Sequence, residues 1–175
     1  MRQPGIVGIH CVTATNALHY GYQASGNDET RRLLMLQAAA FLPMFRKFME
    51  GRGALRALSL DTLRPIETKT GGTEAVEEIL SDVSKDRLVA ARKTLGLLRG
   101  QRVEVQTLMR EARRLIFSKG NDAHDYKFSS AALEDYYHAT PAWREAYLAS
   151  SMFNLRGAFD RDNGLVKRTR DAFGG

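Results

Sequence analysis

The chain has 175 residues, of which 43% are hydrophobic and 26% charged, with a formal net charge of +6. This length suits one domain, and the composition excludes a disordered chain, a collagen-like chain and a coiled-coil rod. The single cysteine, Cys11, excludes an intramolecular disulfide framework and a cysteine-rich zinc site. We therefore expect a single compact domain over residues 1–175.

The first predicted helix spans residues 5–25 and is uncharged, because no Asp, Glu, Lys or Arg occurs between Arg2 and Asp28. Surface helices rarely lack charge over such a length, so we expect this helix to run through the interior. It is not a membrane span, since polar residues such as His10 and Asn16 interrupt the apolar run. Buried polar side chains need internal hydrogen bonds, water or a ligand. This helix is therefore the first place to look for a site.

The second predicted helix spans residues 28–50. It begins with acidic residues, which suit the positive end of the helix dipole. Its apolar residues recur at helical spacing and predict one broad packing face. Pro43 removes one backbone hydrogen bond, and we expect a kink there. Residues 51–72 are rich in glycine and form the longest predicted connection.

Three further helices are predicted over 73–82, 84–99 and 102–118, with Thr73 and Ser84 as N-caps. The stretch 85–119 carries ten Lys and Arg against three Asp and Glu, so most of the positive charge is local. Such a surface can attract phosphate or another anionic partner. The alternative is a solvated helical face. Phe117 is the only aromatic residue in the stretch, so nucleic acid is not the expected partner.

A helix predicted at 122–139 carries the most informative spacing in the chain. One stripe along it, spaced three and four residues apart, is mostly ionisable: His124, Lys127, Ala131, Glu134 and His138. Asp135 lies near the same side. The stripe is either a solvent face or a metal-binding face, because imidazole and carboxylate are common metal ligands. A lysine joins such a site only when deprotonated or carbamylated.

The other histidines lie on the first helix. His10 is the better site candidate, because it shares a side with Thr13, whereas His19 points half a turn away and is expected to hydrogen-bond or pack. Asp135 and His138 have the spacing of four-helix di-metal carboxylate proteins, but no second copy of that motif occurs.

Two last helices are predicted at 141–156 and 163–173, the first with Thr140 as cap and Pro141 in its first turn. No alternating β pattern of useful length occurs. The chain is therefore predicted to be all-α, a helical bundle of about six to eight helices.

Several segments together resemble questin oxidase-like proteins, a family of helical oxidases that includes fungal enzymes acting on anthraquinones. The resemblance lies in an H-x-V-T helix, a Gln-Ala-Ala helix and a D-x-H-x-x-K helix. The matching residues here are His10, Val12 and Thr13; Gln37, Ala38 and Ala39; and Asp122, His124 and Lys127. The resemblance covers the second half of the family domain, so the chain is expected to be the C-terminal half of a larger one.

The resemblance implies an oxygen-using oxidation of an aromatic or polyketide-like small molecule, with non-haem Fe(II) and with NADPH as a candidate electron donor. It implies His10, His124 and Lys127 as metal ligands. His138 and Asp135 are further candidates, and Thr13 and Asn16 are candidate hydrogen-bonding groups around the ligands.

A second function class stays open beside the oxidase. A non-enzymatic helical module could bind a protein, or a nucleic acid through the basic segment 85–119. Either way, we expect a homodimer or a companion chain, because a helix without charge at the start of the chain needs covering on all sides. We expect a cytoplasmic protein without a membrane partner.

Overall fold

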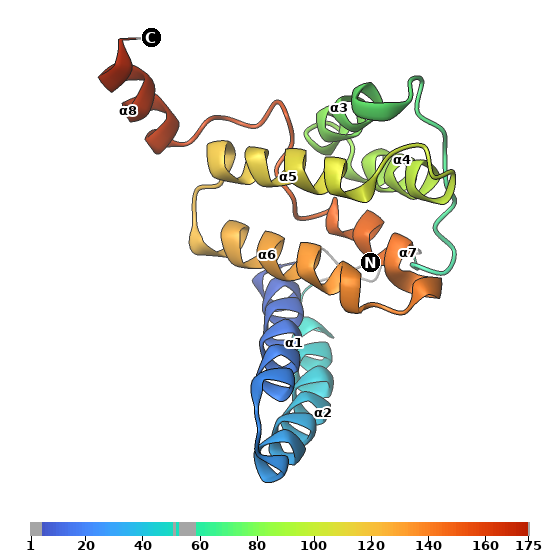
Figure 1. Cartoon of the computed structure of the whole chain (residues 1–175), viewed down its shortest axis with the longest axis vertical. Coiled ribbons are helices and arrows are strands. Elements are labelled where there is room, and N and C mark those ends of the chain that lie inside the picture. Colours follow the sequence, from blue (N-terminus) through green and yellow to red (C-terminus); the bar gives the residue numbers. More distant parts are fainter. Residues whose placement is uncertain (1–4, 51, 53–58, 175) are drawn as a thin grey trace. The chain divides into compact units, whose positions relative to one another are not determined.

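The computed structural model describes residues 5–50, 52 and 59–174. Eight α-helices and no strand occur in these residues, which confirms the predicted all-α helical bundle (Figure 1). The chain divides into two compact units, unit 1 (Met1–Ser59) and unit 2 (Leu60–Gly175). None of the described helices has the length and hydropathy needed to cross a membrane.

Unit 1 is an antiparallel helical hairpin of α1 (Ile6–Ala24) and α2 (Asp28–Glu50). The turn between the helices ends at Asn27, whose side-chain oxygen accepts a hydrogen bond from the backbone N–H of Thr30 at 2.9 Å. This bond caps the second helix, because it satisfies one of the N–H groups that have no partner inside a helix. Pro43 lies inside α2.

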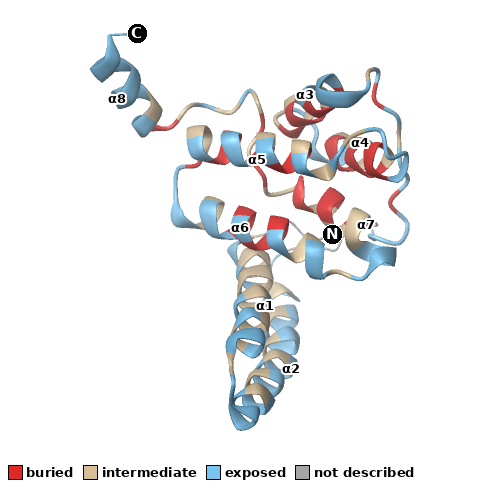
Figure 2. Ribbon diagram, viewed as in Figure 1, coloured by how far each residue is buried: buried red, intermediate tan, exposed pale blue. Residues whose placement is uncertain are grey.

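The expectation that the uncharged first helix runs through the interior is wrong for this structure. No residue of α1 or α2, both of which the structure describes throughout, is buried. Figure 2 accordingly shows only intermediate and exposed residues in the hairpin. The physical reason is that one neighbouring helix covers only one side of another. The absence of charge therefore indicates that the helix is apolar, but not that it is buried.

Unit 2 contains the other six helices. Five of them pack in a closed ring, in which α3 contacts α4 and α5, α7 contacts α4 and α6, and α5 contacts α6. The sixth helix, α8, follows at the carboxyl end. The bounds are α3 (Gly72–Val83), α4 (Arg87–Arg99), α5 (Val105–Lys119), α6 (Ala123–His138), α7 (Pro141–Ser151) and α8 (Gly164–Phe173).

The core of unit 2 fills the inside of this ring. Each ring helix contributes apolar residues at helical spacing, and Figure 2 shows them as the red segments of α3 to α7. The largest fully buried apolar side chains are Val76, Ile79, Val83, Leu95, Leu97, Leu108, Met109, Leu133, Leu148, Met152 and Leu155. Unit 2 thus has a hydrophobic core of its own.

Several helix bounds differ from prediction: α5 begins at Val105 in place of residue 102, α7 ends at Ser151 in place of residue 156, and two further helix starts are shifted. α3 is preceded by Gly71 in place of the predicted cap Thr73, and α4 begins at Arg87 in place of residue 84. The reason for the shift of the α4 start is Asp86, whose carboxylate accepts from the backbone N–H of Leu88 at 2.9 Å and of Val89 at 3.1 Å. An aspartate is as good an N-cap as a serine.

The predicted cap Ser84 has another role. Its hydroxyl donates to Asp160 Oδ1 at 2.7 Å and accepts from the backbone N–H of Phe159 at 3.1 Å. The turn that follows α7 is thereby fastened to the end of α3. Ala158 adds a backbone bond to the carbonyl of Leu80 at 2.8 Å.

α8 has no buried residue along its described length, and it is joined to the ring through the residue before it. The side chain of Asn163 donates to the carbonyls of Phe117 at 2.8 Å and Gly120 at 3.0 Å, and its oxygen caps α8 by accepting from Leu165 and Val166. One buried side chain thus ends one helix and starts another.

Candidate functional site

The ionisable stripe predicted at 122–139 lies on α6. Lys127, Glu134 and His138 are exposed, His124 is half-buried, and Ala131 is buried. Three of the four ionisable members therefore lie in solvent, as the solvent-face alternative predicts.

Asp122, the first residue of the D-x-H-x-x-K match, starts this helix. Its carboxylate accepts from the backbone N–H of His124 at 2.7 Å and of Asp125 at 3.3 Å. These two bonds are the main reason that the pKa of Asp122 lies below its ordinary value. His124 Nδ1 also lies 3.4 Å from the same carboxylate. The structure thus gives Asp122 a role as helix cap.

Asp135 faces α7. Tyr147 donates from its hydroxyl to Asp135 Oδ2 at 3.2 Å. Burial raises the pKa of the Tyr147 phenol far above its ordinary value, and the neighbouring carboxylate raises it further. The phenol therefore stays protonated and acts as a hydrogen-bond donor, which joins α6 to α7.

The first-helix candidates belong to unit 1. His10 is exposed, Asn16 is half-buried, and the Thr13 hydroxyl donates to the backbone carbonyl of His10 at 3.4 Å. Cys11 is half-buried, and burial raises the pKa of its thiol, which opposes a reactive thiolate. His10 thus lies in unit 1, while His124 and Lys127 lie in unit 2.

No group of three or more His, Cys, Asp or Glu side chains is placed to hold a metal ion in the part of the chain that the structure describes. His124 and Lys127 are one turn apart on one helix, and two ligands are fewer than the three that mononuclear iron and zinc enzymes use. The described residues of either unit therefore do not by themselves fit an iron ion.

The basic segment 85–119 has intramolecular partners for most of its charges. The best formed is Lys93, whose ammonium lies 2.5 Å from both Glu78 Oε1 and Asp82 Oδ2. Burial opposes the charged forms, yet the hydrogen bonds outweigh it, so the pKa of Glu78 is lowered and that of Lys93 is raised. Further ion pairs join Arg99 to Glu145, Arg102 to Glu67, Arg110 and Arg114 to Glu111, and Lys119 to Asp162.

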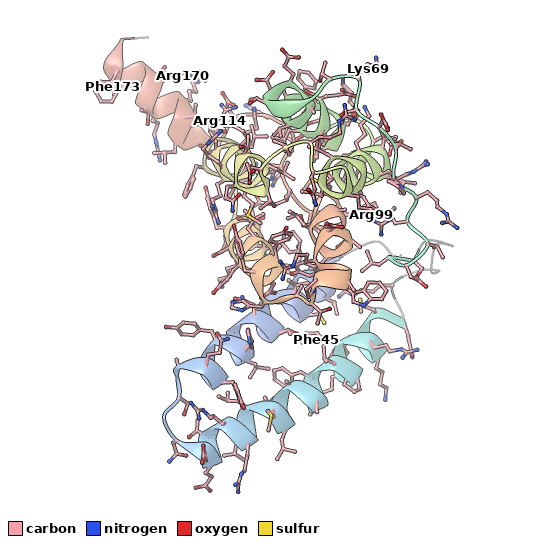
Figure 3. All side chains as sticks on the ribbon, turned by 45° about the vertical axis from the view of Figure 1, so that its right-hand side comes forward. Phe45, Lys69, Arg99, Arg114, Arg170 and Phe173 are labelled. Carbon is pink, nitrogen blue, oxygen red and sulfur yellow. The ribbon has the colours of Figure 1, made fainter. Side chains whose placement is uncertain are left out.

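Two more basic side chains in this segment bind backbone carbonyls, Arg87 at Phe153 and Arg92 at Arg64. Figure 3 shows Arg99 and Arg114 on the outside of unit 2. A basic side chain that is already paired with a carboxylate must break that ion pair before it can bind phosphate. The structure therefore favours a solvated face, whose charges are paired within the chain, over a surface that attracts phosphate.

The hairpin carries a surface that the sequence did not single out. On α2, one row of side chains turns toward α1: Leu34, whose methyl carbons closely approach Gly21, lies in it with Phe41 and Phe45, the last labelled in Figure 3. A second apolar row runs along the same helix roughly 100° away. This row is exposed: Leu33, Leu36, Ala40, Met44 and Phe48.

α1 carries a matching row, with Ile6, His10, Ala17 and Tyr20 exposed at spacings of four, seven and three residues. Seen along each helix from its N-terminus, the exposed row lies about 100° before the row that contacts the other helix, measured in the direction in which the chain winds. Because the helices are antiparallel, equal offsets place both rows on one side of the hairpin. We call these nine residues the hairpin face.

The sequence contains the signal for this face. The apolar residues of 28–50 spread over more than one helical row, wider than a single neighbour can cover. The sequence predicts one broad packing face, whereas within unit 1 only part of that face packs against α1.

Comparison of the chain with protein-family models, with curated proteins and with solved structures finds no match. The questin oxidase-like resemblance therefore stays a proposal.

Proposed function

We propose that this protein is a non-enzymatic helical interaction module, in which unit 2 is a self-supporting bundle and the hairpin face binds a protein partner. The observation that carries the proposal is the contrast between the units. Unit 2 encloses a fully buried core, whereas no residue in either helix of the hairpin is buried.

The chemistry of the face suits a protein partner. No Asp, Glu, Lys or Arg occurs among its nine residues, and its large side chains are aliphatic, aromatic or Met. Soluble monomers rarely expose contiguous apolar patches larger than a few hundred Å², and larger ones mark interaction sites. Aromatic residues and Met are also enriched where proteins bind each other.

Site-specific photo-crosslinking in the native cell tests this function. A photoreactive phenylalanine analogue replaces Tyr20, which lies on the hairpin face and is 65% exposed. The matched control carries the same analogue in place of Phe117 on unit 2, which is 68% exposed. We expect a discrete cross-linked polypeptide from position 20 and none from position 117. Equal or absent cross-linking at the two positions contradicts the proposal.

The metal-dependent oxidase is a second candidate, supported by the H-x-V-T, Gln-Ala-Ala and D-x-H-x-x-K matches. In that case His124 and Lys127 would be two of the ligands, His10 a third, and His138 or Asp135 additional ones. NADPH would be a candidate electron donor and an aromatic small molecule the substrate. A homodimer or companion chain would complete the metal site and the substrate pocket.

Elemental analysis of protein purified from iron-supplemented cells separates the two candidates. The oxidase predicts about one iron per chain, lost in His124→Ala and kept in His19→Ala, a histidine outside the matched motifs. A metal content near zero that His124→Ala leaves unchanged ends the oxidase proposal.

A further inference from the structure

We propose that the partner of the hairpin face is a second copy of this chain, so that two hairpins pack face to face as an antiparallel four-helix bundle. This inference rests on the proposed function, and it names the partner that the face binds. Three properties of the face lead to it: its area, its charge and the distribution of side-chain sizes.

The exposed area is sufficient for a stable dimer. The six large side chains of the face are 44% (Ile6), 65% (Tyr20), 59% (Leu33), 66% (Leu36), 48% (Met44) and 58% (Phe48) exposed. With about 200 Å² for a large side chain, they expose roughly 700 Å² per hairpin. Two copies would then bury roughly 1,400 Å², within the range of specific protein interfaces.

Charge does not oppose the association of two identical hairpins. Residues 5–50 contain four basic and three acidic side chains, so this part of unit 1 is nearly neutral although the chain carries +6. Asp28, Arg32 and Arg46 lie outside the exposed row of α2, whereas Glu29 and Lys47, which have opposite charges, lie at the two ends of that row. Identical surfaces with a net charge would repel each other, and this one has none.

The sizes of the side chains on one copy of the face complement those on a second copy. The α2 row is large except at Ala40, with leucines, Met44 and Phe48, while the α1 row has the small Ala17 in its middle. In a twofold arrangement the same patch is used by both copies. The large row of each copy can then lie over the small row of the other, which packs four helices without voids.

Sedimentation velocity with a matched pair of variants tests the dimer. We expect the wild-type protein to sediment with twice the 19.6 kDa mass of the chain. Leu36→Glu places a charge in the face and should raise the Kd at least about 100-fold. Leu42→Glu is the control, since Leu42 lies on the same helix with 48% exposure but on the other side. It should leave the Kd unchanged.

Methionine oxidation provides a readout on the wild-type protein that needs no variant. Met44 lies in the face, Met35 is exposed on the opposite side of α2, and Met109 is buried in unit 2. On concentration from about 0.1 to about 100 µM, across the Kd range of many dimers, Met44 should become protected. Met35 should stay reactive and Met109 unreactive.

Each outcome separates the inference from the proposed function. A monomer at every concentration, with Met44 as reactive as Met35, overturns the dimer; a cross-link from position 20 to a different polypeptide would then leave the interaction module standing. A monomer in which Met44 is as unreactive as Met109 overturns both, because the chain itself then covers the face. Equal weakening by Leu36→Glu and Leu42→Glu also overturns the dimer through this face.

Discussion

Gly157→Ala should destabilise unit 2 strongly, because the turn after α7 approaches the end of α3 too closely for a side chain. A β-carbon at this position would lie 2.1 Å from Ser84 Oγ, 2.5 Å from Ser84 N and 3.0 Å from Ser84 Cα. Two of these atoms are backbone, so a rotamer change of Ser84 cannot remove the clash. The turn itself must move away from α3.

The cost follows from what that movement breaks. Overpacking of this kind costs about 1–3 kcal/mol. The displaced turn also weakens the bonds that Ser84 makes to Asp160 and to the N–H of Phe159, at about 1 kcal/mol each. We therefore expect a loss of roughly 2–4 kcal/mol in the free energy of unfolding, or up to about half of an ordinary domain's stability.

Urea denaturation followed by circular dichroism measures this loss, with Gly71→Ala as control. No heavy atom lies within 4 Å of a β-carbon at Gly71, which has an ordinary φ of −117°. The control should therefore cost no more than the change of an N-cap from glycine to alanine, about 1 kcal/mol or less. A Gly157→Ala protein that matches the control would refute the packing of this turn against α3.

Three further predictions concern other parts of the chain. The pKa of Glu78 is lowered, so its pair with Lys93 stabilises unit 2 above about pH 4.5 and is lost as the pH falls through the folded-state value; the urea midpoint of Glu78→Gln should depend less on acid than that of the wild type. Asn163→Ala removes the α8 cap and should cost about 1–2 kcal/mol locally, seen as faster amide exchange confined to α8 and the end of α5. Pro43→Ala restores a backbone N–H inside α2, next to Met44 of the hairpin face, and should increase the helicity of the hairpin and tighten dimerisation; unchanged ellipticity and Kd would contradict this.

Much of the fold could be predicted from local sequence signals. Gly100 and Gly120 end α4 and α5 as expected, and Pro141 opens α7. These signals act within a few residues, so a single sequence contains them. The shift of the α4 start from Ser84 to Asp86 shows the limit, because two good caps lay close together. Only the contact of Ser84 with a turn more than 70 residues away decides between them.

The candidate site was harder to predict for the same reason. The α6 stripe is visible in sequence, but whether Lys127 faces solvent or a ligand depends on packing partners distant in the chain. The uncharged α1 was assigned to the interior because absence of charge usually accompanies burial. Within unit 1 its apolar surface packs against α2. Whether another chain covers the remaining apolar surface of α1 depends on association, about which the pattern of one sequence contains no information.

Hydrogen exchange at several protein concentrations reports on the folding of unit 2 and on the association of the hairpin in one experiment. If unit 2 folds on its own core and the hairpin is completed by a second copy, amide protection in α1 and α2 should rise as the protein is concentrated, while protection in α3 to α7 stays constant. Hairpin protection that is high and independent of concentration in a monomeric protein would contradict the account.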